Sequence, residues 1–203
     1  MPAIGITGGI STGKSTFVEY LRELLPTATF FDADEAVHAV LNRPEVQKQI
    51  RRGFGVRVFS TSGDLNRAKL RAIVFANANK KRALERILHP RIRRQWRAEA
   101  KRHRNSPKFF FADIPLLYET GGESLCDKVV VVACSQKAQL ARLRKRMSVG
   151  NTEAKQMIKS QMPLEEKISR ADHVVWNNGG RRSLMEQARL LVALWQGQRW
   201  TKK

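Results

Sequence analysis

The chain has 203 residues, of which 42% are hydrophobic, so it is long enough for one domain, or for a core that carries a smaller insert. It contains no stretch of 18 or more apolar residues, and its first residues show no basic segment followed by an apolar one, so neither a membrane span nor a secretory signal is expected. The formal net charge of +20 favours a polyanionic partner, which could be a nucleic acid, a nucleotide, an acidic cofactor or a membrane surface.

A strand–helix–strand unit is predicted at the start of the chain. Residues 3–7 form a short apolar run, a glycine-rich turn follows, and apolar residues recur at helical spacing from Lys14 onward. A second short strand is predicted over residues 29–31, and it leads into Asp32 and Asp34. Such a unit indicates a parallel sheet.

The segment from residue 35 to residue 105 has a mostly helical pattern, which one clear turn at residues 60–64 interrupts. Within it, His89-Pro90 is expected to break a helix, and Pro90 is expected to open the next helix at its first position. A helical block placed between strands predicts a substrate-binding subdomain.

Strand patterns return after this block. Residues 109–111 lead into Asp113, and residues 129–132 form a continuous apolar run, as expected for strands of a parallel sheet that are buried on both faces. The remaining predicted elements are a basic helix over residues 136–146, a polar helical stretch over residues 152–170 with a break at Pro163, a strand over residues 174–176 and a final amphipathic helix. The chain is therefore predicted to have an α/β fold with helices around a parallel sheet.

The most specific motif is a phosphate-binding loop, or P-loop. Residues 8–15 match G-x-x-x-x-G-K-[ST] at every fixed position, between a predicted strand and a predicted helix. Glycine lets backbone N–H groups point at phosphate oxygens, and the helix N-terminus adds a partial positive charge. Lys14 can reach the β- and γ-phosphates, while the Ser15 hydroxyl can ligate Mg²⁺. The residues expected to bind the phosphates are Gly8, Gly9, Ile10, Ser11, Thr12, Gly13, Lys14, Ser15 and Thr16.

Two carboxylates follow the second predicted strand, where strand ends line the ligand crevice of a parallel sheet. Asp34 could accept the proton of an attacking hydroxyl, and Asp32 could contact Mg²⁺. The plainer alternative is that Asp34 only caps a helix, which aspartate favours. The residue types leave both readings open.

Further charged side chains follow later strands. Asp113 is placed as a Walker-B aspartate that supports Mg²⁺, or as a carboxylate that caps the next loop. Of the arginines at 142, 144 and 146, Arg142 and Arg146 share one helix face and are the candidates for closing over ATP, whereas a solvated basic face is the alternative.

The P-loop does not identify the phosphoryl acceptor. The chain is short, and it lacks the N-K-x-D element with which GTPases read guanine, so a small kinase is favoured. The two cysteines, Cys126 and Cys134, do not have metal-site spacing, and free thiols in a reducing cytoplasm are expected rather than a disulfide.

Several segments, taken in order, resemble the dephospho-CoA kinase family across nearly the whole chain. The P-loop alone is generic, but the ordered set with its spacing is specific. The matching segments are residues 6–10 with the lysine loop, Asp32-Ala33-Asp34, Leu65-Asn66-Arg67 with Leu70-Arg71 and Val74-Phe75, Leu88-His89-Pro90, residues 114–119, residues 139–143 with Arg146, and Ala171-Asp172 through Gly179.

This resemblance implies that ATP phosphorylates the ribose 3′-hydroxyl of dephospho-CoA in the last step of coenzyme A synthesis. It also implies a P-loop core over residues 1–35, 107–141 and 171–203, a helical CoA-substrate domain over residues 36–106, and a lid over residues 142–170. The implied functional residues are Asp34 as the base, Arg142 on the lid side, Asn177 near the adenine, and His89, Pro115, Leu116 and Leu117 on the acceptor side.

Two positions depart from the family pattern. Ser11 stands where the family usually has glycine, so a positive φ there would strain the backbone modestly. Met147 follows Arg146 where an acidic or amide residue is common. Neither departure removes a group that performs chemistry.

Two other functions were weighed against this one. A nucleoside monophosphate kinase would share the P-loop but not the acceptor-side segments. A nucleic-acid-binding protein would explain the charge, yet the chain shows no recognisable RNA- or DNA-binding module, and its basic residues are not interleaved with aromatics. Neither a nucleic acid nor a membrane is therefore expected as the main partner.

Overall fold

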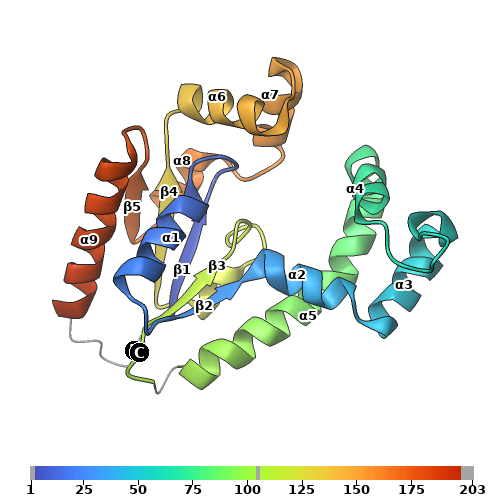
Figure 1. Cartoon of the computed structure of the whole chain (residues 1–203), viewed down its shortest axis with the longest axis horizontal. Coiled ribbons are helices and arrows are strands. Elements are labelled where there is room, and N and C mark those ends of the chain that lie inside the picture. Colours follow the sequence, from blue (N-terminus) through green and yellow to red (C-terminus); the bar gives the residue numbers. More distant parts are fainter. Residues whose placement is uncertain (1–2, 104–105, 198–203) are drawn as a thin grey trace. The chain divides into compact units, whose positions relative to one another are not determined.

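The computed structural model describes residues 3–103 and 106–197. The chain divides into two compact units, one with the residues up to Phe31 and from Glu99 onward (unit 1), the other with Asp32–Ala98 (unit 2). Figure 1 labels the elements of both units.

Unit 1 is built on a five-stranded parallel sheet with the order β2-β3-β1-β4-β5 (Figure 1). Its strands are β1 (Ala3–Gly8), β2 (Thr29–Asp32), β3 (Phe110–Asp113), β4 (Lys128–Ala133) and β5 (His173–Trp176). The central strand β1 pairs Ile6 with Asp113 of β3 and Gly8 with Val132 of β4. The end of β1 therefore lies between the ends of two neighbouring strands, which is where ligands bind in open α/β sheets.

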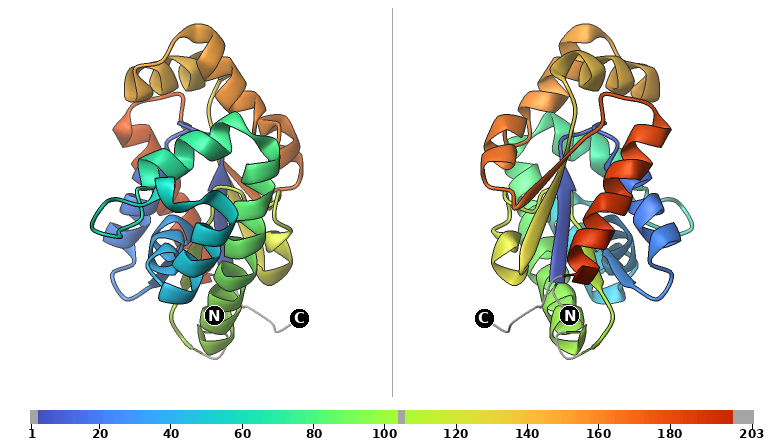
Figure 2. Two further views of the ribbon diagram at one scale, coloured as in Figure 1. Left: turned by 90° about the vertical axis from the view of Figure 1, so that its right-hand side faces the viewer. Right: turned by 90° about the vertical axis from the view of Figure 1, so that its left-hand side faces the viewer.

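The helices of unit 1 are α1 (Lys14–Leu24), α6 (Gln136–Met147), α7 (Asn151–Lys159), α8 (Leu164–Ser169) and α9 (Arg181–Gly197), with the short 3₁₀ helix η2 (Gly122–Leu125). Helices α1 and α9 pack together, and Figure 2 shows α9 running alongside the sheet. The core between them and the sheet includes Phe17, Leu21, Phe111 and Trp195, all fully buried. Each such side chain stabilises the fold by about 1.5–3 kcal/mol relative to exposure, which fixes the strands that carry the site.

Unit 2 consists of α2 (Ala33–Leu41), α3 (Pro44–Phe54), the 3₁₀ helix η1 (Val56–Val58), α4 (Arg67–Ala76) and the larger part of α5 (Ala78–His103). It has a hydrophobic cluster of its own, which includes Val40, Ile50, Phe54 and Leu88. The helical pattern in the sequence is thus explained by a second, separate core.

One prediction in this unit is wrong. His89-Pro90 does not separate two helices, because α5 runs without interruption from Ala78 to His103 with Pro90 inside it. A proline removes one backbone hydrogen bond and crowds the preceding turn. Here the helix continues with Pro90 on an exposed face, and the Arg91 guanidinium donates to the Ile87 carbonyl at 2.6 Å, next to the Arg86 carbonyl that lacks a proline N–H partner.

The other predicted elements are present, with ends shifted by one or two residues. Pro163 precedes α8, as the break between α7 and α8 requires. Residues 104 and 105, the last of the stretch predicted to be helical, lie outside the described residues. Within the described part of the chain, no helix combines the length and the apolar character needed to cross a membrane.

Candidate active site

The P-loop joins β1 to α1. Gly13 is the N-cap of α1 and has a φ of 98°, in the left-handed region that glycine tolerates best. A Cβ atom at Gly13 would also collide with the Asn177 side chain. The motif glycine is therefore required both by its backbone conformation and by the close approach of Asn177.

Ser11 takes a left-handed backbone conformation with a φ of 59°, so the strain expected at this departure from the family pattern is confirmed. Its Oγ atom is buried and has no hydrogen-bond partner among the residues that the structure describes. A buried hydroxyl in a phosphate-binding turn can donate a hydrogen bond to a phosphate oxygen. The loop thus fits a nucleotide phosphate at Ser11.

Side chains from distant helices and loops hold the peptide of Ile10. Its N–H group donates to Gln161 Oε1 at 2.8 Å, and its carbonyl accepts from Gln139 Nε2 at 2.9 Å. Neither glutamine was among the site residues predicted from the sequence. The one available signal was that Gln139 lies three residues before Arg142, on the same face of α6.

Arg142 and Asn177, both predicted site residues, meet at the Thr12 carbonyl. Asn177 Nδ2 donates to it at 2.9 Å, and Arg142 Nη1 donates at 3.4 Å. Arg146 is exposed, one turn further along α6, so Arg142 rather than Arg146 contacts the loop. A cavity of about 350 Å³ opens beside this point, lined by Gly13, Thr16, Arg142, Asn177, Gly179, Gly180, Arg181 and Leu184.

The thiol of Cys134 lies close to Arg142. Burial raises the pKa of this thiol, and the Arg142 guanidinium opposes the rise. Both cysteines are free, as expected, and burial raises the pKa of Cys126 to about 12. Neither thiol is therefore an activated nucleophile at neutral pH.

Lys14 and Asp113 form an ion pair in which both side chains are largely buried. The pairing of β1 with β3 explains the contact, because Asp113 ends β3 beside the strand that leads into the P-loop. Asp113 thus faces the nucleotide-binding loop, as a Walker-B aspartate does.

The donors for Mg²⁺ follow from this arrangement. Mg²⁺ is usually held by one or two carboxylates together with phosphate oxygens and water. Asp113 and the hydroxyl of Ser15, at the start of α1, supply protein oxygens of this kind. The residues therefore fit a Mg²⁺ that arrives with a nucleotide.

Asp32 and Asp34 have different local roles. Asp32 ends β2 and is the N-cap of α2, since its Oδ1 atom accepts from the N–H groups of Asp34 at 2.8 Å and Glu35 at 3.0 Å. The capping role considered for Asp34 therefore belongs to Asp32. Asp34 lies in the first turn with an exposed side chain.

The segment after β3 carries the predicted acceptor residues Pro115, Leu116 and Leu117. Pro115 and Leu116 are partly exposed, whereas Leu117 is fully buried. Leu117 packs so close to β1 that a Cβ atom at Gly5 would lie 2.9 Å from its Cδ2 atom. The backbone of this segment is thereby held against the strand that leads into the P-loop.

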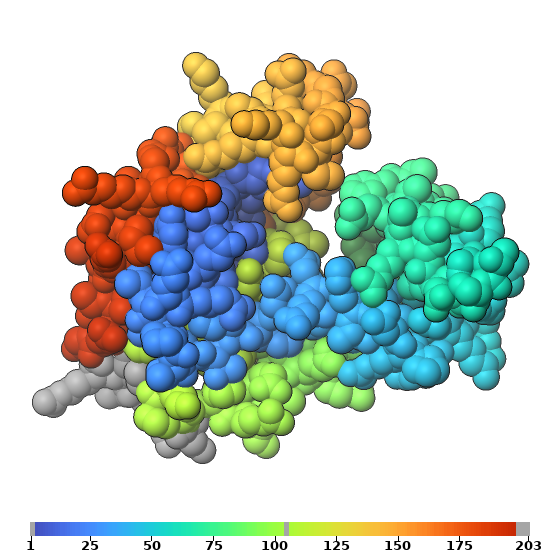
Figure 3. All heavy atoms as spheres, in the orientation of Figure 1, coloured from blue at the N-terminus to red at the C-terminus, as the bar shows by residue number. Residues whose placement is uncertain are grey.

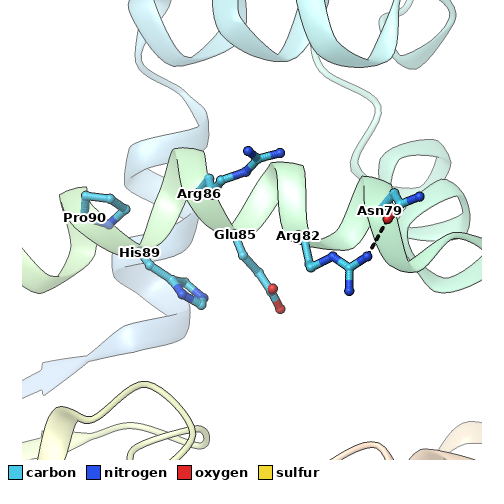
Figure 4. A pocket seen from close by; sticks show the side chains of 6 residues that line it. All are labelled: Asn79, Arg82, Glu85, Arg86, His89 and Pro90. Carbon is cyan, nitrogen blue, oxygen red and sulfur yellow. Dashed lines mark hydrogen bonds between the residues drawn. The ribbon is translucent and has the colours of Figure 1, made fainter.

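His89 lies in unit 2, on the exposed side of α5. It lines an open hollow of about 720 Å³ with Asn79, Arg82, Glu85, Arg86 and Pro90. Figure 4 shows Arg82, Glu85 and His89 projecting from one side of the helix, with the hydrogen bond from Arg82 to Asn79. This face offers cationic and imidazole groups to an anionic or polar ligand.

Comparison with known proteins identifies the family to which the chain belongs. The family model for dephospho-CoA kinase matches residues 2–183. A dephospho-CoA kinase of Geobacillus kaustophilus is 43% identical, over 95% of this chain and 96% of that protein. Among solved structures, TT1252 from Thermus thermophilus superposes with a TM-score of 0.78 at 29% identity, over 97% of this chain and 98% of that chain. The dephospho-CoA kinase of Campylobacter jejuni superposes with a TM-score of 0.72 at 29% identity, over 94% and 95% of the two chains.

Proposed function

The chain belongs to the dephospho-CoA kinase family and phosphorylates dephospho-CoA to give coenzyme A, and we propose that it uses ATP and Mg²⁺ through the P-loop of unit 1. The observation that carries this proposal is the loop on β1 and α1, with Lys14 beside Asp113 and an unpartnered Ser11 hydroxyl among the described residues. These groups are the ones that a nucleoside triphosphate and its metal ion require.

Lys14 exchanges partners when the nucleotide binds. Its ammonium is paired with Asp113, and the β- and γ-phosphates are the stronger, more highly charged acceptors. When Lys14 pairs with the phosphates instead, the carboxylate of Asp113 would be available to the metal ion. Ser15, Asp113 and Asp32 would hold Mg²⁺, which neutralises charge on the transferring phosphoryl group.

Asp34 is the proposed general base. It is exposed in the first turn of α2, directly after the end of β2, and the cap of that helix is provided by Asp32 instead. Its carboxylate is therefore available to take the proton of the ribose 3′-hydroxyl as the oxygen attacks phosphorus. A proton acceptor is useful here because an alcohol is a weak nucleophile.

Binding of the acceptor, dephospho-CoA, is assigned to two sets of residues. His89 belongs to the open face of α5, where polar groups can bind the charged part of dephospho-CoA, and Pro115, Leu116 and Leu117 follow β3. Leu117 is packed in the core, so its contribution is to fix the backbone of this segment, while Pro115 and Leu116 offer surface to the ligand.

The nucleotide base and the lid form the remaining part of the proposal. The 350 Å³ cavity beside Asn177 suits the adenosine end of ATP, because it opens directly next to the P-loop. Arg142 approaches the loop from α6, and Arg146 extends the same basic face. Residues 142–170 act as a lid, and Figure 3 shows α6 and α7 standing out as a projecting block of unit 1.

One assay tests the assignment. Release of the nucleoside diphosphate is measured with ATP or GTP as the phosphoryl donor and with dephospho-CoA, AMP, CMP or no acceptor. Among these acceptors, we expect only dephospho-CoA to support turnover. Without an acceptor, ATP hydrolysis should be slow, because a site that admitted water as the acceptor would waste ATP. Faster turnover with a nucleoside monophosphate would overturn the acceptor assignment, and strict use of GTP would overturn that of ATP.

The remaining parts of the proposal concern location and nucleic acid. Two free cysteines suit a reducing compartment, and we assign the protein to the cytoplasm. The charge of +20 is not assigned to a nucleic-acid function. Tight, steeply salt-dependent binding to DNA by a preparation without kinase turnover would reverse that choice.

A further inference from the structure

Helix α8 carries a lysine whose side chain is fully buried. Lys167 has 0% exposure, whereas lysine is almost never fully buried without partners. Its ammonium lies 2.8 Å from Glu119 Oε1, 3.0 Å from the Pro115 carbonyl and 3.4 Å from the Gly8 carbonyl. An ammonium has three N–H donors, so these three acceptors use its whole capacity.

The three acceptors come from different parts of the site. Gly8 ends β1 and begins the P-loop, whereas Pro115 begins the segment assigned to the acceptor. Glu119 also accepts from the Met162 N–H at 3.0 Å, just before α8. Lys167 is therefore the side chain at which the P-loop, the segment after β3 and α8 are joined.

Additional contacts hold the P-loop, the segment after β3 and α8 together. Thr7 Oγ1 donates to the same Pro115 carbonyl at 3.0 Å. Arg170, one turn beyond Lys167, pairs with Glu123 at 2.5 Å and lies over the Tyr118 ring at 4.3 Å. Helix α8 thus holds the segment after β3 at several points along its length.

A structural ion pair is the simpler explanation, and it accounts poorly for this geometry. Removing an ammonium from water is costly, and well-packed apolar side chains usually stabilise a core as well or better. Two of the three partners of Lys167 are backbone carbonyls, which fix the path of the chain rather than balance charge. Lys167 is suited to hold two backbone segments at a set separation.

We propose that Lys167 is a positioning residue for phosphoryl transfer. It fixes the backbone of Pro115–Leu117 relative to the first residue of the P-loop, and so sets the acceptor hydroxyl against the γ-phosphate. This inference rests on the proposed function, because it takes that segment to be on the acceptor side. It does not require Lys167 to touch either substrate, which its burial prevents.

The decisive variant is Lys167→Met, which keeps an unbranched side chain and removes the ammonium. We expect kcat with dephospho-CoA to fall on the order of 10²-fold, as small misplacements of reacting groups do, while ATP binding stays close to the parent value. Hydrolysis of ATP without acceptor should fall much less, because water needs no positioning by the acceptor segment. The ratio of transfer to hydrolysis therefore drops.

Two single variants and one double variant serve as controls. Lys128→Met removes another lysine–carboxylate pair of unit 1, with Asp172 at 2.8 Å, and should leave kcat and that ratio unchanged. Glu119→Gln keeps an oxygen acceptor for Lys167 and should retain most of the turnover, because both carbonyl contacts remain. Lys167→Met/Glu119→Gln should be as slow as Lys167→Met even if its melting temperature recovers.

The outcomes separate this inference from the function beneath it. A parent enzyme that does not phosphorylate dephospho-CoA contradicts the proposed function itself. If the parent is active and the Lys167→Met variant folds with a normal kcat, only the positioning role is contradicted. The same holds if the double variant recovers both its melting temperature and its kcat. If Lys167→Met does not fold, Lys167→Gln decides, because its amide keeps a polar donor in the buried site but cannot make all three contacts of the ammonium. A drop in kcat of about threefold to tenfold is then expected, and an unchanged kcat overturns the inference.

Discussion

The functional side chains of the two units are held in different ways. In unit 1, Lys14, Asn177 and Lys167 are partly or fully buried and bonded to named partners in other elements. In unit 2, Asp34 and His89 are exposed on helix surfaces. The proposed nucleotide site and the segment after β3 are thus preorganised in unit 1, whereas the proposed acceptor residues of unit 2 have side chains that are free to adjust to a ligand.

This difference has a physical reason. Phosphoryl transfer depends on charges fixed in advance around the γ-phosphate, and a buried, bonded residue does not need to be reorganised when the reaction occurs. A large flexible acceptor is bound through surface groups instead. Removing a functional group should therefore change both stability and rate in unit 1, and rate or affinity alone in unit 2.

The largest effect is expected for Lys14→Ala. Turnover should fall by on the order of 10³–10⁵-fold, the range for losing a cation that neutralises the transferring phosphoryl group. The variant should fold but melt several degrees lower, because Asp113 loses its ion pair in a largely buried position. A coupled assay and a thermal melt measure both quantities.

A double variant separates the two effects of this change. Lys14→Ala/Asp113→Asn removes the charge of both partners, so part of the lost melting temperature should return while turnover remains low. Near-parental turnover of folded Lys14→Ala would contradict the role of the loop. An unchanged melt would show that the buried pair contributes nothing to stability.

Asp34→Asn should lower turnover by on the order of 10²–10⁴-fold, the usual contribution of a general base. Its melting temperature and its affinity for ATP and dephospho-CoA should not change, since Asp32 rather than Asp34 caps α2. Glu35→Gln, in the same helical turn, is the matched control and should be nearly silent. Turnover is measured beside a melt and an ATP titration.

The results for Asp34→Asn identify the base. Retained turnover would transfer the role to Asp32. Lost turnover with weakened binding of Mg·ATP would instead place Asp34 on the metal ion. A lowered melting temperature of Asp34→Asn would contradict the difference between the units, because it would show that Asp34 stabilises the fold of unit 2.

His89→Ala should raise the KM for dephospho-CoA about tenfold, the equivalent of one hydrogen bond to a polar or charged group. The kcat and the melting temperature should stay near the parent values, because the side chain is exposed on α5. His38→Ala, at another exposed histidine of unit 2, is the control. A fall in kcat at unchanged KM would give His89 a role in the chemical step.

The sequence predicted the P-loop and the strands on either side of it because glycine spacing and apolar periodicity are local properties. It did not predict that α5 continues through Pro90, because residues on both sides of the proline, such as Leu88 and Ile92, pack on the hydrophobic cluster of unit 2, and such packing is not a local property. Gln161 lies 151 residues from Ile10 in sequence and Lys167 lies 52 from Pro115. Polar residues without a motif acquire a role only from such distant partners, so sequence analysis missed them.

The same contrast between fixed and adjustable parts runs through the proposed lid. Helix α8 is fixed to the rest of unit 1 through Lys167 and Arg170. Helix α7 buries only Ala154 among its nine residues. The segment 142–170 therefore has a firmly held end and a loosely held middle.

The smallest effect is expected in hydrogen exchange of this segment. Local opening depends on the contacts that hold a helix, and Lys167 and Arg170 bind α8 to other parts of unit 1, so amides of α7 should exchange faster than those of α8 in the free enzyme. ATP and a dephospho-CoA analogue that lacks the 3′-hydroxyl should together slow α7 by about tenfold, since closure excludes water from the reacting groups. Amides of α8 should change little, because Lys167 already holds that helix. The comparison is made at matched pH with each ligand alone and with both. Equal slowing of α7 and α8 would show that the whole segment moves as one body, and no slowing of α7 at saturation would remove the lid from the mechanism.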